Sequence, residues 1–205
     1  MFNLAKQTLL DQNELTEANL ERIFDIMLER NMDEADLYFQ LSRSQGWSID
    51  EGIVKSGAFS IDAGVGVRAI KDDKVAFAYS DDITFPSLLS AAEAARTIGV
   101  TGTGTANVSL RQTGSLTTRY RSSDPIYSLE DVEKVALLHR IESMARQMDP
   151  RIIQVAATLA STHDTILVAR SDGSMSGDVR PLVRLSIEVI AEQNGRREQG
   201  RSGGG

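Results

Sequence analysis

The sequence predicts an α+β fold, with mostly antiparallel sheet structure and helices packed on one face. Segments with a hydrophobic period of two gather at residues 36–79 and 151–199, while helical periods lie before and between them. Short turn motifs join neighbouring strand segments, and turns this short connect only antiparallel strands. We therefore expect hairpins packed under helices rather than a doubly wound parallel sheet.

Two helices are expected at the start of the chain, over residues 2–11 and about 17–30. In the second helix, apolar residues recur at spacings of three and four behind Thr16, which is a suitable N-cap. These residues are Leu20, Ile23, Phe24, Met27 and Leu28. The stripe that they form must pack against a later part of the chain.

A first group of strands follows. Alternation begins at Asp36, and a second strand is expected from about Trp47 to Lys55. The clearest alternation covers 59–70, and the polar residues after it predict a hairpin turn into a partner strand at 75–79.

Thr84 then caps a helix that is expected to run to about Ala95. Residues 99–124 are rich in Gly, Thr and Ser and lack a sustained period, so we expect a long surface loop there. Ser128 and Asp131 resemble a capping box at the start of a helix that ends near residue 149. The expected apolar face of this helix consists of Leu137, Leu138, Ile141, Met144, Ala145 and Met148.

Strand periodicity returns after Pro150. A second group of hairpins is expected, because turn motifs again separate short alternating segments. The expected strands cover 153–159, 165–170 and 180–192, with turns at 161–164, 172–173 and 194–195.

Composition limits the kinds of partner. The 205-residue chain carries a net charge of -7, and glutamates interrupt its one basic concentration between Arg180 and Arg201, so nucleic acid is not an expected partner. The chain contains no cysteine, which excludes disulfides and thiolate ligands within these residues. The polar start and the lack of an apolar run of ~20 residues indicate a cytoplasmic protein without a membrane partner.

The chain has two histidines, His139 and His163. His139 and Glu142 share a flank of the predicted helix, but His139 points away from its apolar face, so we interpret it as a solvated surface residue. Ser161, His163 and Asp164 offer the residue types of a hydrolytic triad. Neighbours in one tight turn cannot take up that geometry, and a hairpin turn explains all three.

Glycines suggest two further sites. Gly102-Thr103-Gly104 resembles a phosphate-binding loop, but no strand, helix or lysine accompanies it, so we interpret it as a flexible loop. Gly64 and Gly66 lie on the open face of the predicted strand 59–70, where glycine indicates close backbone approach. We favour packing as the reason, with approach of a ligand as the alternative. Arg68 shares this face and is a candidate for lining a substrate passage.

Arg180 and Arg184 flank Pro181 in the last predicted strand. Their guanidinium groups suit bidentate binding of a peptide carboxylate, although ion pairing on an edge strand is the interpretation that we favour. The chain ends in glycines, which favour no regular element. We therefore expect a hinge formed by Ser202, Gly203, Gly204 and Gly205.

Several segments carry a family resemblance through their order and spacing. They are Asp36–Gln40, Gly64–Ile70, Ala76–Tyr79, Ala94–Ile98, Asp178–Ser186 and Arg197–Gly205. On these segments the chain resembles the TldD/PmbA family of zinc metallopeptidases, and its TldD branch in particular. The resemblance spans nearly the whole chain and is weakest over 100–120.

The resemblance implies a zinc-dependent peptidase that acts on short or unfolded peptides together with a related subunit, TldE (PmbA). An older name for family members is modulator of DNA gyrase. The family's catalytic signature, His-Glu-x-x-x-His with a further cysteine ligand, belongs to a carboxy-terminal domain, and nothing in this sequence matches it. We therefore expect no catalytic or metal-binding residue here, and zinc only in the carboxy-terminal domain.

The same resemblance implies the domain organisation. Residues 1–200 would form the amino-terminal α+β domain, with sub-units 1–98 and 125–200 joined by the 99–124 loop, and 201–205 would start a linker to the catalytic domain. Its expected role is scaffold and assembly with a TldE/PmbA-like subunit or by self-association, without catalysis of its own. The alternative is a complete protein-binding module that acts without any peptidase activity.

Overall fold

The computed structural model describes residues 1–29, 31–98, 108–113 and 121–205, so Gly102–Gly104 and most of the expected 99–124 loop lie outside the described residues. The chain divides into two compact units. Unit 1 comprises residues 1–42, 62–120 and 164–179, and unit 2 comprises residues 43–61, 121–163 and 180–205.

The α-helices of the described chain are those that the sequence predicts. They are α1 (Phe2–Leu9), α2 (Glu17–Leu28), α3 (Phe85–Ala95) and α4 (Asp131–Met148), with 3-10 helices η1 (Asp11–Asn13) and η2 (Arg96–Ile98). Thr16 and Thr84 cap α2 and α3, because each side-chain oxygen accepts a main-chain N–H of the first turn. Within the described residues, no helix combines the length and the apolarity that a membrane crossing requires.

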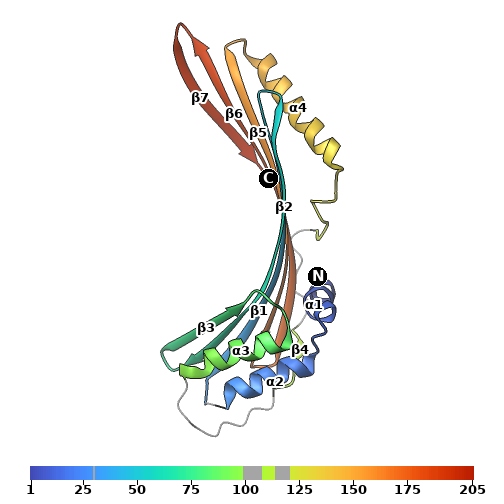
Figure 1. The fold of residues 1–205 in the computed structure, drawn as a ribbon, viewed down its shortest axis with the longest axis vertical. Coiled ribbons are helices and arrows are strands. Elements are labelled where there is room, and N and C mark those ends of the chain that lie inside the picture. Colours follow the sequence, from blue (N-terminus) through green and yellow to red (C-terminus); the bar gives the residue numbers. More distant parts are fainter. Residues whose placement is uncertain (30, 99–107, 114–120) are drawn as a thin grey trace. The chain divides into compact units, whose positions relative to one another are not determined.

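The strands form one seven-stranded sheet in the order β3-β2-β1-β5-β6-β4, and β7 also pairs with β6 (Figure 1). Their bounds are β1 (Glu34–Asp50), β2 (Ile53–Lys71), β3 (Lys74–Ser80), β4 (Arg111–Gln112), β5 (Ile152–Arg170), β6 (Ser174–Gln193) and β7 (Arg196–Gly204).

Pairing in the sheet is mostly antiparallel. β2–β3 and β6–β7 are antiparallel hairpins, whereas the short β4 pairs with β6 in parallel. Between β1 and β5, Ser171 N–H donates to the carbonyl oxygen of Ala35, and Glu51 N–H donates to that of Val155. Residue numbers thus fall along β5 as they rise along β1, which is antiparallel pairing without an inserted residue. The predicted α+β fold is confirmed.

In unit 1, α1, α2 and α3 pack on one face of the strands. Alternate residues of β1 and β2 form the floor of this core, as the period of two predicts. The apolar stripe of α2 packs on this floor, and the alanines of α3 allow its close approach. The fully buried large side chains here include Leu20, Ile23, Phe24, Met27, Leu37, Phe39 and Leu88.

In unit 2, α4 covers a smaller core. Its buried apolar residues are Ile49, Leu138, Ala157 and Leu159, with Trp47, Leu137, Ile141 and Leu185 partly buried around them. The predicted apolar face is wrong at Met144 and Met148, whose exposed fractions are 58% and 85%. Lys134 and Glu142 are buried instead. They share one helical stripe with Leu138 and Ala145, and this stripe is the buried side of α4.

The start of α4 also differs from the prediction. The cap is Glu130, whose capping box is with Glu133, and the helix begins at Asp131. The hydroxyl of Ser128 donates to the carbonyl oxygen of Pro125 instead, so it organises the turn before the helix.

Two predictions are wrong: the strand expected at 47–55 and the turn expected at 161–164. The β1–β2 turn is Glu51-Gly52, inside the strand expected at 47–55, and its residues have φ angles of 54° and 70°. These left-handed angles are those of a type I′ hairpin. Conversely, the expected turn at Ser161–Asp164 lies within β5, where Ser161 and His163 are buried. Their polarity suggested a turn, but the strand continues through them, and the buried His163 has Arg43 as its partner.

The C-terminal segment forms a regular strand, contrary to the expectation of irregular structure. β7 pairs with β6 from Gln193↔Arg196 to Leu185↔Gly204, after the expected turn at Asn194-Gly195. A side chain at Gly203 would lie 2.8 Å from the carbonyl oxygen of Leu185, so glycine fits where the two strands approach closely. The hinge role of Ser202, Gly203, Gly204 and Gly205 stays a prediction.

Replacement of Gly173 by Ala should destabilise unit 1. Gly173 has a φ of +85°, and an added Cβ would lie 2.5 Å from the carbonyl oxygen of Ser109. We expect Gly173→Ala to lower the free energy of unfolding by about 1–3 kcal/mol, measured by urea denaturation. Gly200→Ala is the matched control, because its Cβ would make only an ordinary contact with Val189. Equal stability of the two variants would contradict this account of the turn.

Arg151 should control the acidity of Asp149 at the end of α4. Hydrogen bonds from the Arg151 side chain and amide lower the pKa of Asp149 from 3.8 to about 2. Because the folded-state pKa is depressed, this pairing stabilises the fold above about pH 3.8, and the contribution is lost as the pH falls through about 2. We expect Arg151→Ala to raise the pKa of Asp149 toward 3.8 in an NMR carboxyl titration. Arg140→Ala, an exposed change on α4, should leave the midpoint unchanged.

Candidate functional site

Charged side chains lie buried under α4 in unit 2. Glu142 is 7% exposed, and its Oε1 accepts hydrogen bonds from Nε and Nη2 of Arg146 at 3.3 Å each. Its Oε2 lies 4.0 Å from Nδ1 of His139. Both partners are on α4 itself, since residues three and four apart share a helix face. A buried carboxylate requires such a partner, because an unpaired charge is costly away from water.

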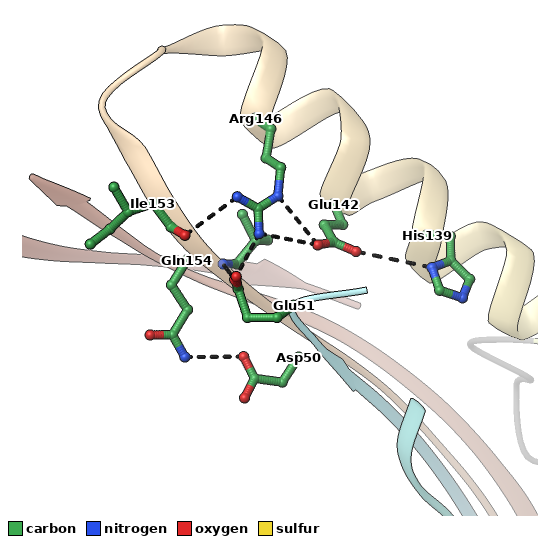
Figure 2. A network of polar contacts seen from close by, with 8 residues as sticks. Asp50, Glu51, His139, Glu142, Arg146, Ile153 and Gln154 are labelled. Carbon is green, nitrogen blue, oxygen red and sulfur yellow. Dashed lines mark hydrogen bonds and ion pairs between the residues drawn. The ribbon is translucent and has the colours of Figure 1, made fainter. Parts of the chain in front are cut away.

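Arg146 links α4 to the β1–β2 turn and to β5, as Figure 2 shows. Its Nη2 donates to Oε1 of Glu51 at 2.7 Å, and the same Glu51 oxygen accepts the main-chain N–H of Val155 at 2.9 Å. Nη1 donates to the carbonyl oxygen of Ile153 at 3.4 Å. We call Glu51, Glu142 and Arg146 the α4 network. One guanidinium group thus holds a helix, a turn and a strand together.

Lys134 lies near the start of α4 and is 2% exposed. Its Nζ donates to the carbonyl oxygen of Ile126 at 2.5 Å, to Oε1 of Gln45 at 2.6 Å and to Oδ1 of Asp131 at 3.2 Å. An ammonium group has three donors, and here all three are used. Lys134 therefore ties the segment before α4 to β1, and each of its three N–H donors has an acceptor within the protein.

Arg43 joins β1, β5 and the segment before α4. Its Nη2 donates to Oδ2 of Asp124 at 2.7 Å and to Nδ1 of His163 at 3.0 Å, and its guanidinium carbon lies 5.7 Å from the centre of the Tyr127 ring. Because a guanidinium nitrogen only donates, Nδ1 of His163 is the acceptor in this contact. His163 is buried, and its Nδ1 is occupied by Arg43.

The described residues do not fit a zinc site. A catalytic zinc needs three protein ligands converging on one point, and none of the described residues form a group of three or more His, Cys, Asp or Glu side chains that could hold a metal ion. His163 Nδ1 already accepts a hydrogen bond from Arg43, while His139 is paired with Glu142. His139 lies partly at the surface of α4, as the sequence predicts.

The structure brings Gly64, Gly66 and Arg68 together on β2 in unit 1. A side chain at Gly64 would lie 2.9 Å from a main-chain oxygen at the end of β3, and one at Gly66 would lie 2.9 Å from the Phe77 ring. Both glycines therefore allow β3 to pack closely. Arg68 pairs with Asp36 at 2.5 Å, and this contact raises the pKa of Arg68. A substrate-passage role for these residues stays a prediction.

Arg180 and Arg184 are exposed on β6 in unit 2, a different unit from Gly64 and Gly66. Pro181 lies between the β6 residues that pair with β4 and those that pair with β7, where the described chain places no outer strand. Proline is tolerated there because its missing N–H breaks no ladder bond on that side. Binding of a peptide carboxylate by the two arginines also stays a prediction.

Sequence reasoning missed the buried charges of unit 2. Lys134 and Glu142 each lie four residues from Leu138, on the same helical stripe, and this spacing was the available signal. The role of Arg43 had no local signal, because its partners Asp124 and His163 lie 81 and 120 residues away in the sequence.

Removal of the Arg146 guanidinium should destabilise unit 2. In Arg146→Ala, the buried carboxylate of Glu142 loses its main donor, and Glu51 loses its link to α4. Because Arg146 is itself partly exposed, we expect a loss of about 1–3 kcal/mol in urea denaturation. Arg140→Ala removes the same group from an exposed position of α4 and should cost less than about 0.5 kcal/mol. If both variants unfold alike, the α4 network does not stabilise the fold.

Comparison with family models places two domains on the chain. Residues 35–99 match the model described as PmbA/TldA metallopeptidase domain 1, and residues 124–205 match the model described as PmbA/TldA metallopeptidase central domain. Together they cover both strand groups that the sequence predicts.

Curated relatives agree with these models. The chain is 43% identical over 206 residues to a protein of Haemophilus influenzae named Metalloprotease TldD homolog, and 37% identical to one of the same name from Buchnera aphidicola. Each alignment covers 100% of this chain, but only 43% and 42% of the relatives. The chain thus spans less than half the length of the curated relatives that it matches.

Solved structures share the fold at low sequence identity. A Thermotoga maritima protein described as a modulator of DNA gyrase aligns with a TM-score of 0.70 at 13% identity, covering 91% of this chain and 42% of that one. TldE from Thermococcus kodakarensis aligns with a TM-score of 0.66 at 17% identity, over 91% of this chain and 42% of that one. With the family models and relatives matched along its length, the chain belongs to the TldD/PmbA family of metallopeptidases.

Proposed function

We propose that this chain is the scaffold and assembly part of a TldD-like zinc-dependent peptidase. The whole protein would degrade or mature small unfolded peptides together with a TldE/PmbA-like subunit, and zinc would be held by residues outside this chain. The contribution of residues 1–205 would be positional, since they would wall and orient the peptidase site without touching the reacting atoms.

The observation that carries this proposal is that the described residues do not provide a set of zinc ligands. The two imidazoles lie on α4 and on β5 with different partners, and the chain has no cysteine to complete a set of zinc ligands. The described residues therefore do not supply the chemistry that the name of the relatives, metalloprotease, requires. The matched relatives are more than twice as long as this chain, which leaves room for that chemistry elsewhere.

The buried charges support a scaffold role in another way. Lys134, Glu142 and Arg43 each have polar partners inside unit 2: Lys134 donates to the Ile126 carbonyl oxygen, Glu142 accepts from Arg146, and Arg43 donates to Asp124 and His163. Buried hydrogen-bonded networks rigidify a fold. A rigid unit can hold a reactive site in a neighbouring domain in a fixed geometry.

Zinc binding and peptide cleavage by the 205-residue chain test the proposal. After incubation with zinc and gel filtration, we expect substoichiometric metal by mass spectrometry and no cleavage of a fluorogenic unstructured peptide. The full-length Haemophilus influenzae relative, mixed with its TldE/PmbA-like subunit, is the positive control for both measurements. Stoichiometric zinc with turnover by the 205-residue chain, abolished in His139→Gln or His163→Gln, would refute the scaffold role.

A further inference from the structure

His163 is an ionisable side chain with almost no access to solvent. It lies on β5 in unit 2, and its exposed fraction is 4%. Its Nδ1 accepts a hydrogen bond of 3.0 Å from Nη2 of Arg43 on β1. The imidazole is the side chain whose ordinary change of charge falls between about pH 5 and 8. The contact between His163 and Arg43 therefore depends on a proton that binds in the ordinary range of pH.

A proton on Nδ1 of His163 is incompatible with this contact. The proton would point at an N–H group of Arg43, and a guanidinium nitrogen cannot accept a hydrogen bond. The two side chains would also carry like charges 3.0 Å apart, at a position where burial limits screening by water. The contact must therefore break when Nδ1 is protonated.

The charged and ionisable groups at this contact come from β1 and from the segment before α4. Oδ2 of Asp124 accepts from the same Arg43 nitrogen at 2.7 Å, and the Tyr127 ring lies 5.7 Å from the guanidinium carbon. Asp164 follows His163 on β5, but strand alternation directs its side chain to the opposite face of the sheet. The carboxylate of Asp124 is thus already paired with one cation, and an imidazolium would add a second.

Asp124 connects Arg43 to the turn that leads into α4. Its Oδ1 accepts the main-chain N–H of Ile126 at 2.9 Å, while its Oδ2 accepts from Arg43. The carbonyl oxygen of Ile126 in turn accepts from Nζ of Lys134, which is the next cation along this segment. Ile126 is 2% exposed, as is Lys134. The turn is therefore fixed from one side by Arg43 and from the other by Lys134.

We propose that His163 is a pH-sensitive latch for residues 121–130, the segment that precedes α4. While Nδ1 is unprotonated, Arg43 bridges His163 and Asp124 and holds the segment on β1 and β5. When Nδ1 takes up a proton, the imidazolium repels Arg43, Asp124 loses its fixed partner, and the turn at Ile126 opens. The latch belongs to the fold of unit 2, so it does not depend on the peptidase role of the whole protein.

The direction of the pH effect follows from proton binding. The closed segment excludes a proton from Nδ1, whereas a free imidazole takes one up near about pH 6.5. The opened state therefore binds more protons, and acid favours it. One pH unit below that value, a free imidazole is protonated about ten to one. The equilibrium constant for opening should thus rise about tenfold between about pH 7.5 and about pH 5.5.

Hydrogen exchange at the Ile126 amide measures this opening, because Asp124 holds that N–H. After correction for the intrinsic pH dependence of exchange, we expect its protection to fall about tenfold between about pH 7.5 and about pH 5.5. In His163→Asn the fall should be absent, since the amide oxygen takes the place of Nδ1 as acceptor and binds no proton. His139→Asn is the matched control. It changes the other histidine, which is 43% exposed on α4, and should behave like the unchanged chain.

Nitrogen NMR of the unchanged chain gives a second measurement, which decides the question even if His163→Asn does not fold. The Nδ1 resonance of His163 should be that of an unprotonated nitrogen at about pH 7.5. Its change to a protonated one on acidification should coincide with the loss of protection at Ile126. Circular dichroism verifies that each chain is folded at both pH values.

Two results would overturn the proposal. The first is a fall in the protection of Ile126 that is as large in His163→Asn as in the unchanged chain. The second is a protonated Nδ1 on His163 while Ile126 stays fully protected, because Arg43 would then not hold the segment through this nitrogen.

Discussion

The buried carboxylate of Glu142 is the constraint on which the arrangement of unit 2 depends. An unpaired charge in this position would cost several kcal/mol, so a cation must lie beside it. Arg146 fulfils this need and at the same time binds Glu51, which holds a left-handed backbone conformation in the β1–β2 turn. The packing of α4 and the point at which β1 reverses into β2 are thus coupled through a single guanidinium group.

Local turn chemistry decided which hairpins could be predicted from the sequence. Asn194-Gly195 is recognisable because asparagine tolerates the left-handed region, whereas Glu51-Gly52 has the same conformation without that residue preference. Glu51 is held by Arg146, 95 residues away, and His163 is kept within a strand by Arg43, 120 residues away. No pattern in a short window contains such partners. Helix caps at Thr16 and Thr84 were predictable because their partners lie three residues on.

The candidate sites also divide into features with a local sequence signal and features that depend on residues far away in the sequence. Helical periodicity predicted α4. Because it sorts residues by hydrophobicity, it placed Met148 on the buried face and did not place Lys134 and Glu142 there. Lys134 can be buried because β1 and the segment before α4 provide acceptors for its ammonium group, and Glu142 can be buried because Arg146 on α4 donates to its carboxylate. Gly66 was recognisable as a position of close approach, whereas the Phe77 ring that covers it became evident only with the pairing of β2 and β3.

β7 has no buried residue to hold it in place, since each of its side chains is exposed and several of its residues are glycine. The Asn194-Gly195 turn sets its register on β6, and charge agrees with that register: Arg197 lies opposite Glu192, and Arg201 lies opposite Glu188, with ion pairs of 2.7 and 3.5 Å. A slip by two residues would keep the main-chain ladder but move the two arginines opposite Ile190 and Ser186. Exposed ion pairs are screened by dissolved salt, so these cross-strand attractions weaken with electrolyte while the turn and the main-chain ladder keep the strand aligned.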